Sequence, residues 1–158
     1  VERGTVLVAP ADLQIRMQRD GAGNYTVSCK PGEKVSGHRP SVDSLFLSMA
    51  QVVRHQMVGI IMTGMGRDGA EGLLAMRKQG AFTIGQDRES SVVYGMPMVA
   101  YDIGAVQVQA PATTLLRAAA PFANHVKPLK RAHGPFFICP AGRQRTGKKF
   151  WLSPVRPS

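Results

Sequence analysis

An apolar run that ends in a glycine-rich turn constrains the fold of this chain more than any other feature of its sequence. Residues 58–63 have the composition of a buried strand, and three glycines lie in the next segment, residues 64–69. A helical pattern follows over 70–79, and a further apolar run covers 81–85. This order predicts one complete βαβ unit, with parallel strands and a right-handed connection.

The N-terminal part of the chain predicts further strands. Residues 5–9 form a short β-branched apolar run that stops at Pro10, which is typical of a buried strand. Residues 14–18 and 25–29 flank an Asp-Gly-Ala-Gly-Asn segment and predict a small β-hairpin.

A helix is predicted over residues 42–55, after a loop over 31–40. Ser41 stands at the N-cap position and Asp43 in the first turn, where both residue types stabilise a helix start. Apolar residues recur behind them at helical spacing.

The second half of the α/β pattern is less regular. Residues 89–94 are expected to start a helical stretch that is interrupted at Gly95-Met96-Pro97, and residues 105–108 to form a strand. The predicted fold class is therefore α/β: a doubly wound, mostly parallel sheet in a Rossmann-like three-layer arrangement, with a small β-hairpin.

Length and charge divide the chain into a body and a tail. A length of 158 residues with 44% hydrophobic content is enough for one core. We predict one domain over 1–117 and a basic, proline-rich tail over 118–158 that is disordered. Eight of the 20 Lys and Arg lie in residues 121–158, which contain no Asp or Glu. The body is therefore nearly neutral, and we expect no nucleic-acid partner.

Cysteine and histidine patterns predict neither a metal nor a cofactor. Cys29 and Cys139 are far apart, and the four histidines show no metal-binding spacing. The apolar runs are too short to span a bilayer, and nothing at the N-terminus resembles a signal peptide. We expect a cytoplasmic protein without membrane insertion.

The glycine turn at 64–69 is the first candidate site. Strand ends and helix N-termini converge there in α/β sheets, so backbone N–H groups are available to bind an anion or an oxyanion. Gly64-x-Gly66-x-x-Gly69 also matches a dinucleotide fingerprint, with Asp87 placed as a ribose-binding acid. Against this alternative, the Asp68 carboxylate would repel a pyrophosphate and suits a partner histidine better.

Four ordered motifs resemble one enzyme family. They are His38-Arg-Pro-Ser-Val-Asp43, Thr63-Gly-Met-Gly-Arg-Asp-Gly-Ala70, Gly80-Ala-Phe-Thr-Ile-Gly-Gln-Asp87 and Ser90-Ser-Val-Val-Tyr-Gly-Met-Pro97. In order and spacing they resemble the catalytic domain of the chemotaxis protein-glutamate methylesterases of the CheB type. The resemblance runs from about residue 3 to about residue 117. It implies that residues 1–117 are the C-terminal part of the methylesterase catalytic domain, with the sheet truncated at the N-terminus.

The resemblance implies a serine hydrolase that removes methyl esters from chemoreceptor glutamates, releases methanol and often deamidates glutamines. The family uses a Ser-His-Asp triad, whose acid corresponds to Asp68, and an oxyanion hole to which Met65 corresponds. A buried carboxylate that orients the base and an N–H in a glycine turn suit these roles.

The implied partners are the cytoplasmic domains of methylated chemoreceptors. The family's receiver domain, whose phosphorylation relieves inhibition, is expected to be absent from this chain. The family's serine and histidine are expected upstream of the matching segment, so we expect this chain alone to be inactive.

Ser41 with His38 is an improbable substitute pair for this serine and histidine, because Ser41 is explained as a helix cap. An inactive interaction protein that uses the basic tail is a third hypothesis.

Overall fold

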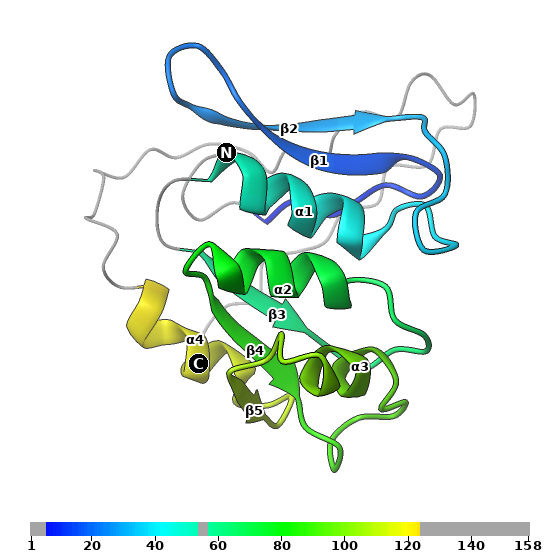
Figure 1. The fold of residues 1–158 in the computed structure, drawn as a ribbon, viewed down its shortest axis with the longest axis vertical. Helices are drawn as coiled ribbons and strands as arrows, with labels where there is room; N and C mark the ends of the chain where they lie inside the picture. Colours follow the sequence, from blue (N-terminus) through cyan, green and yellow to red (C-terminus); the bar gives the residue numbers. More distant parts are fainter. Residues whose placement is uncertain (1–5, 54–56, 124–158) are drawn as a thin grey trace, which may run out of the picture.

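A parallel sheet lies at the centre of the fold in the computed structural model, which describes residues 6–53 and 57–123 (Figure 1). Its strands are β3 (Val58–Ile61), β4 (Phe82–Gln86) and β5 (Val108–Ala110), in the order β3-β4-β5. Both strand pairs are parallel. The predicted βαβ unit is therefore confirmed, with α2 (Ala70–Lys78) as its helix.

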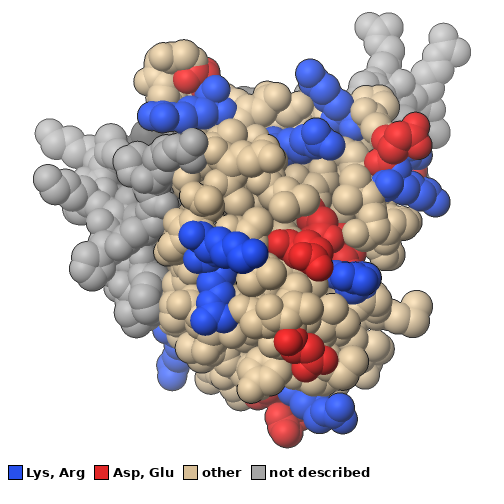
Figure 2. Space-filling model, in the orientation of Figure 1, with Lys and Arg blue, Asp and Glu red and all other residues tan. Residues whose placement is uncertain are grey.

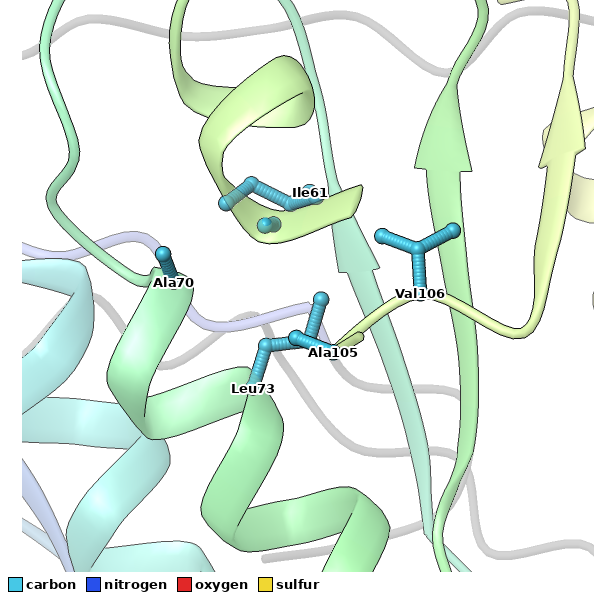
Figure 3. Packing of buried hydrophobic residues seen from close by; sticks show 6 residues of the cluster. Ile61, Ala70, Leu73, Ala105 and Val106 are labelled. Carbon is cyan, nitrogen blue, oxygen red and sulfur yellow. The ribbon is translucent and has the colours of Figure 1, made fainter. Parts of the chain in front are cut away.

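Helices cover both faces of this sheet. α2 and α3 (Met96–Asp102) pack on one face, and α4 (Leu115–Ala123) packs on the other. Figure 3 shows the first interface, where Leu73 of α2 points toward Ala105 and Ile61 of β3 lies close by. The three layers confirm the predicted doubly wound α/β fold. The buried apolar cluster between α2, α3 and the sheet consists of Ile61, Ala70, Leu73, Ala100, Ala105 and Val106.

The predicted hairpin is also present and lies outside the sheet. β1 (Gln14–Arg19) pairs antiparallel with β2 (Tyr25–Lys30), and α1 (Val42–Val52) lies between this hairpin and α2 (Figure 1). Ser41 is the N-cap of α1, as the sequence predicts, and its hydroxyl accepts a hydrogen bond from the Ser44 N–H. The hairpin thus buries the outer face of α1.

The strand predicted over residues 5–9 is wrong for the part that the structure describes. Residues 6–9 form no strand, and the side chains of Val6 and Val8 are exposed. β-branched residues alone do not make a strand, because their preference depends on a neighbouring strand and a face to bury.

Two predictions in the second half are also wrong in detail. Residues 89–94 form turns and an isolated bridge, and α3 begins only at Met96, because Pro97 suits the first turn of a helix. The strand predicted over 105–108 is β5 and covers Val108–Ala110. Ala105 and Val106 are buried but lie before it.

The predicted domain boundary at 117/118 falls inside α4. The predicted tail from residue 124 onward lies outside the described residues.

On the face drawn in Figure 2, acidic and basic side chains of the described part are interspersed and form no continuous basic patch. None of the helices in this part is long and apolar enough to cross a membrane.

Candidate functional site at the turn between β3 and α2

Asp68 lies at the end of the glycine turn, and its side chain is buried. The carboxylate contacts the N-terminus of α1, which is distant in sequence. Oδ1 accepts hydrogen bonds from the Ser41 hydroxyl at 2.7 Å and from the Asp43 N–H at 3.0 Å, and Oδ2 accepts one from the Val42 N–H at 2.8 Å. Asp68 is only 4% exposed. A helix N-terminus stabilises such an anion, because its first N–H groups have no partner within the helix.

A second carboxylate makes the reverse contact. Asp43, in the first turn of α1, accepts the Gly72 N–H of α2 through Oδ1 at 2.8 Å. Its Oδ2 accepts the Ser36 hydroxyl at 3.1 Å. The two helix starts are therefore held together by charge-assisted hydrogen bonds from each side.

Close packing allows this contact. Gly69 has φ of +91°, which favours glycine, and a Cβ atom there would lie 2.6 Å from Cγ1 of Val42. A Cβ atom on Gly72 would likewise lie 2.6 Å from Cβ of Phe46. These glycines let α1 approach the turn closely enough for Asp68 to reach its N–H groups.

The other end of the turn is fixed by the segment before α3. The Gly64 N–H donates to the Val93 carbonyl, and the Gly64 carbonyl accepts the Met96 N–H. The Thr63 hydroxyl also bonds to both backbone groups of Val93. Four hydrogen bonds thus fix the backbone directly before residue 65.

Met65 lies at the exposed tip of this fixed backbone. Its side chain is 82% exposed. Within residues 6–53 and 57–123, its N–H donates to no backbone carbonyl. A rigid turn with an unused N–H is the kind of group that can stabilise a developing oxyanion.

The structure argues against the dinucleotide alternative. Asp43 already occupies the N-terminus of α2, where the pyrophosphate would bind. Gly95 also packs closely against the start of the turn, because a Cβ atom on Gly95 would lie 2.7 Å from the Gly64 carbonyl oxygen. Asp87 accepts both the N–H and the hydroxyl of Ser90, which explains it as a turn residue.

The structure gives the serines near the turn structural roles. Ser41 is 1% exposed and acts as a helix cap, whereas His38 is exposed in the loop before it. The Ser90 hydroxyl accepts the Ala112 N–H and the Gln86 side-chain N–H, which explains Ser90 as a residue that holds the loop after β4. No three His, Cys, Asp or Glu side chains of the described part gather into a possible metal site.

Sequence reasoning found Ser41, Asp43 and Asp68 but missed their mutual contacts. It treated Asp43 as an ordinary first-turn acid and gave no partner for Asp68 in this chain. The contacts join residues 25 to 29 positions apart. No local pattern reports such a pairing, although two acids near two helix starts are a weak signal of capping.

Comparisons with known proteins identify the family of this chain. Residues 1–118 match the sequence model of the family described as CheB methylesterase. This chain belongs to the CheB methylesterase family. The match covers the turn with Met65 and Asp68, both helix starts and the segment before α3.

Several CheB-family relatives are close in sequence. A protein of Syntrophomonas wolfei named protein-glutamate methylesterase/protein-glutamine glutaminase 2 is 62% identical over 111 residues, which are 70% of this chain and 32% of the relative. A protein of Sulfurimonas denitrificans named protein-glutamate methylesterase/protein-glutamine glutaminase is 55% identical over 115 residues, 73% of this chain and 32% of the relative. The chain thus spans about a third of the length of these curated relatives.

A solved structure of the family has the same fold. The crystal structure of the Thermotoga maritima CheB methylesterase catalytic domain aligns with a TM-score of 0.65 at 26% identity. The alignment covers 69% of this chain and 57% of that domain.

Proposed function

We propose that the protein to which this chain contributes hydrolyses methyl esters of glutamate side chains on chemoreceptors. In this proposal Asp68 is the acid of a Ser-His-Asp triad, and the Met65 N–H donates to the oxyanion. The serine and the histidine come from a segment that precedes the matching region. This chain alone is inactive, and the complete protein acts in the cytoplasm.

The observation that carries the proposal is the buried carboxylate of Asp68, held beside a rigid turn. A triad acid must keep a fixed direction in order to hold one imidazole tautomer and to stabilise the imidazolium that forms. Asp68 meets this requirement, because its carboxylate accepts three hydrogen bonds from the start of α1.

The chemistry follows from these roles. The serine hydroxyl transfers its proton to the imidazole as its oxygen attacks the ester carbonyl. The carbonyl oxygen becomes negatively charged and accepts a hydrogen bond from the Met65 N–H. The imidazolium returns the proton to the leaving methoxide, which departs as methanol. Water then attacks the acyl-enzyme by the same route and releases the glutamate. A glutamine amide would lose ammonia instead, which matches the second activity named for the Syntrophomonas wolfei relative.

The exposed side chains near the turn suit a protein substrate. Met65 and Val92 are 82% and 92% exposed, and Val92 belongs to the segment that fixes the turn. Apolar side chains at the rim of a site can contact the surface of a macromolecule. The proposed partners are the cytoplasmic domains of methylated chemoreceptors, and a receiver domain elsewhere in the complete protein.

A chimera provides the test. In this chimera, residues of this chain replace the matching 111 residues of the Syntrophomonas wolfei relative. We expect it to release methanol from methylated receptor, and Asp68→Asn to lower kcat by about 10⁴-fold because the imidazole loses its orienting carboxylate. Asp102→Asn, an exposed acid at the end of α3, is the matched control and should keep full activity. Equal activity of Asp68→Asn and the control would refute the role of Asp68.

A further inference from the structure

We propose that Ser41 is a positioning residue for Asp68, acting together with the first N–H groups of α1. The inference rests on the proposed function, since it concerns the direction in which the triad acid points. In it, α1 serves as a clamp that fixes the plane of the carboxylate, and Ser41 supplies the side-chain part of that clamp.

The count of acceptor positions supports the inference. A carboxylate offers about four lone-pair positions, two on each oxygen. Oδ1 of Asp68 accepts two hydrogen bonds, from Ser41 and Asp43, whereas Oδ2 accepts only one, from Val42. The clamp therefore leaves one acceptor position, on Oδ2, and that oxygen is the one assigned to the imidazole N–H.

The Ser41 hydroxyl makes the shortest contact of the clamp. It lies 2.7 Å from Oδ1, within the range of an O–H donor bound to an anion. Ser41 is 1% exposed, so water does not compete for this hydrogen bond. Its hydroxyl also accepts the Ser44 N–H, a longer contact at 3.3 Å. With its lone pair facing Ser44, the hydroxyl directs its proton to Asp68.

The clamp is itself anchored from the hairpin side. The Ser41 N–H donates to Oε1 of Gln14, a buried residue of β1, at 3.0 Å. Nε2 of Gln14 donates to the carbonyls of Glu33 and His38, which precede α1. The hairpin and the loop thus fix the backbone position from which the Ser41 hydroxyl reaches Asp68.

The clamp is tested in the chimera with variants that separate positioning from helix capping. Ser41→Ala removes both hydrogen bonds of the hydroxyl. Ser41→Gly also removes the hydrogen bond to Asp68, but glycine is tolerated better than alanine at an N-cap. The glycine variant is therefore assayed in its place if Ser41→Ala does not fold. Ser48→Ala is the matched control in the same helix. The Ser48 hydroxyl bonds to the Met17 N–H and the Leu45 carbonyl, and it makes no hydrogen bond with Asp68.

We expect both Ser41 variants to lower kcat for methanol release about tenfold with KM unchanged, which is the effect of losing one charged hydrogen bond. Ser48→Ala should lower the melting temperature while kcat stays unchanged. Should the folded Ser41 variants keep the kcat of Ser48→Ala, Ser41 is only a cap and the inference is wrong. Asp68→Asn separates the two ideas. If it is inactive while the Ser41 variants are active, the positioning role alone fails; if it is active, the proposed function fails as well.

Discussion

Asp68 and Asp43 form a reciprocal pair of helix caps: Asp68 caps α1, which contains Asp43, and Asp43 caps α2, which begins after Asp68. Asp68 precedes α2 and accepts the Val42 N–H of α1 at 2.8 Å, whereas Asp43 lies in α1 and accepts the Gly72 N–H of α2 at 2.8 Å. Two carboxylates thus join the starts of two helices side by side, and one of them is the proposed triad acid. The same contacts serve the stability of the fold and the direction of Asp68.

Removal of Asp43 tests the stabilising half of this exchange. Asp43→Ala leaves the Gly72 N–H without its acceptor inside the structure, so we expect the free energy of unfolding to fall by about 2 kcal/mol. Urea unfolding of the 158-residue chain measures this. Asp102→Ala is the control at an exposed position. Equal midpoints for the two variants would mean that the Asp43 contact contributes nothing.

Gly95→Ala tests whether the turn at Met65 must keep its position. The added Cβ would lie 2.7 Å from the Gly64 carbonyl oxygen and 3.3 Å from Cα of Met65, and these backbone atoms cannot move independently. A displacement of about 1 Å can cost about 100-fold in rate, so kcat of the chimera should fall by that order. Gly21→Ala, where the Cβ meets nothing within 4 Å, is the matched control. Full activity of Gly95→Ala would contradict a role for this turn.

The interface between α2 and the sheet should dominate the stability of the described part. Leu73 is 0% exposed, and its replacement by alanine leaves a cavity. Leu73→Ala should therefore lower the free energy of unfolding by about 2 to 5 kcal/mol. Leu116→Ala on α4, where the side chain is 80% exposed, should change it by less than about 0.5 kcal/mol. Urea midpoints of the two variants compare these effects directly, and similar losses would place the core elsewhere.

The hairpin turn predicts one pH effect. The side chain and then the N–H of Asn24 hold the pKa of Asp20 below its ordinary value, because both donate to the ionised carboxylate. A lowered folded-state pKa means that this contribution to stability is present above the unfolded pKa and is lost as the pH falls through the folded pKa. In Asn24→Ala the Asp20 pKa should rise, as followed by carboxyl NMR titration. An unchanged pKa would show that the side-chain contact is absent.

Most of the architecture could be predicted, because it follows from local patterns. The apolar run at β3, the glycine turn and the cap at Ser41 each carry a signal within a few residues. The strand predicted over 5–9 failed in the described part because a strand also needs a partner. The start of α3 was misplaced because Pro97 was treated as a break, although proline is well suited to a helix start.

The site could be predicted only in part. The sequence indicated Asp68 and Met65 through a resemblance to the family, and these two roles are still predictions. It did not identify the contact between Asp68 and Ser41, because that pairing depends on how α1 packs against the turn. Contacts of this kind arise from the tertiary fold and leave no period in the sequence.

The most direct measurement of the central claim is an NMR spectrum of the imidazole N–H protons in the chimera. A triad imidazole that donates to a carboxylate gives a low-field proton signal, since its N–H forms a strong hydrogen bond to an anion. We predict that the chimera shows this signal and that Asp68→Asn abolishes it while Asp102→Asn preserves it. A low-field signal that persists in Asp68→Asn would mean that another group holds the imidazole and that Asp68 serves only to cap α1.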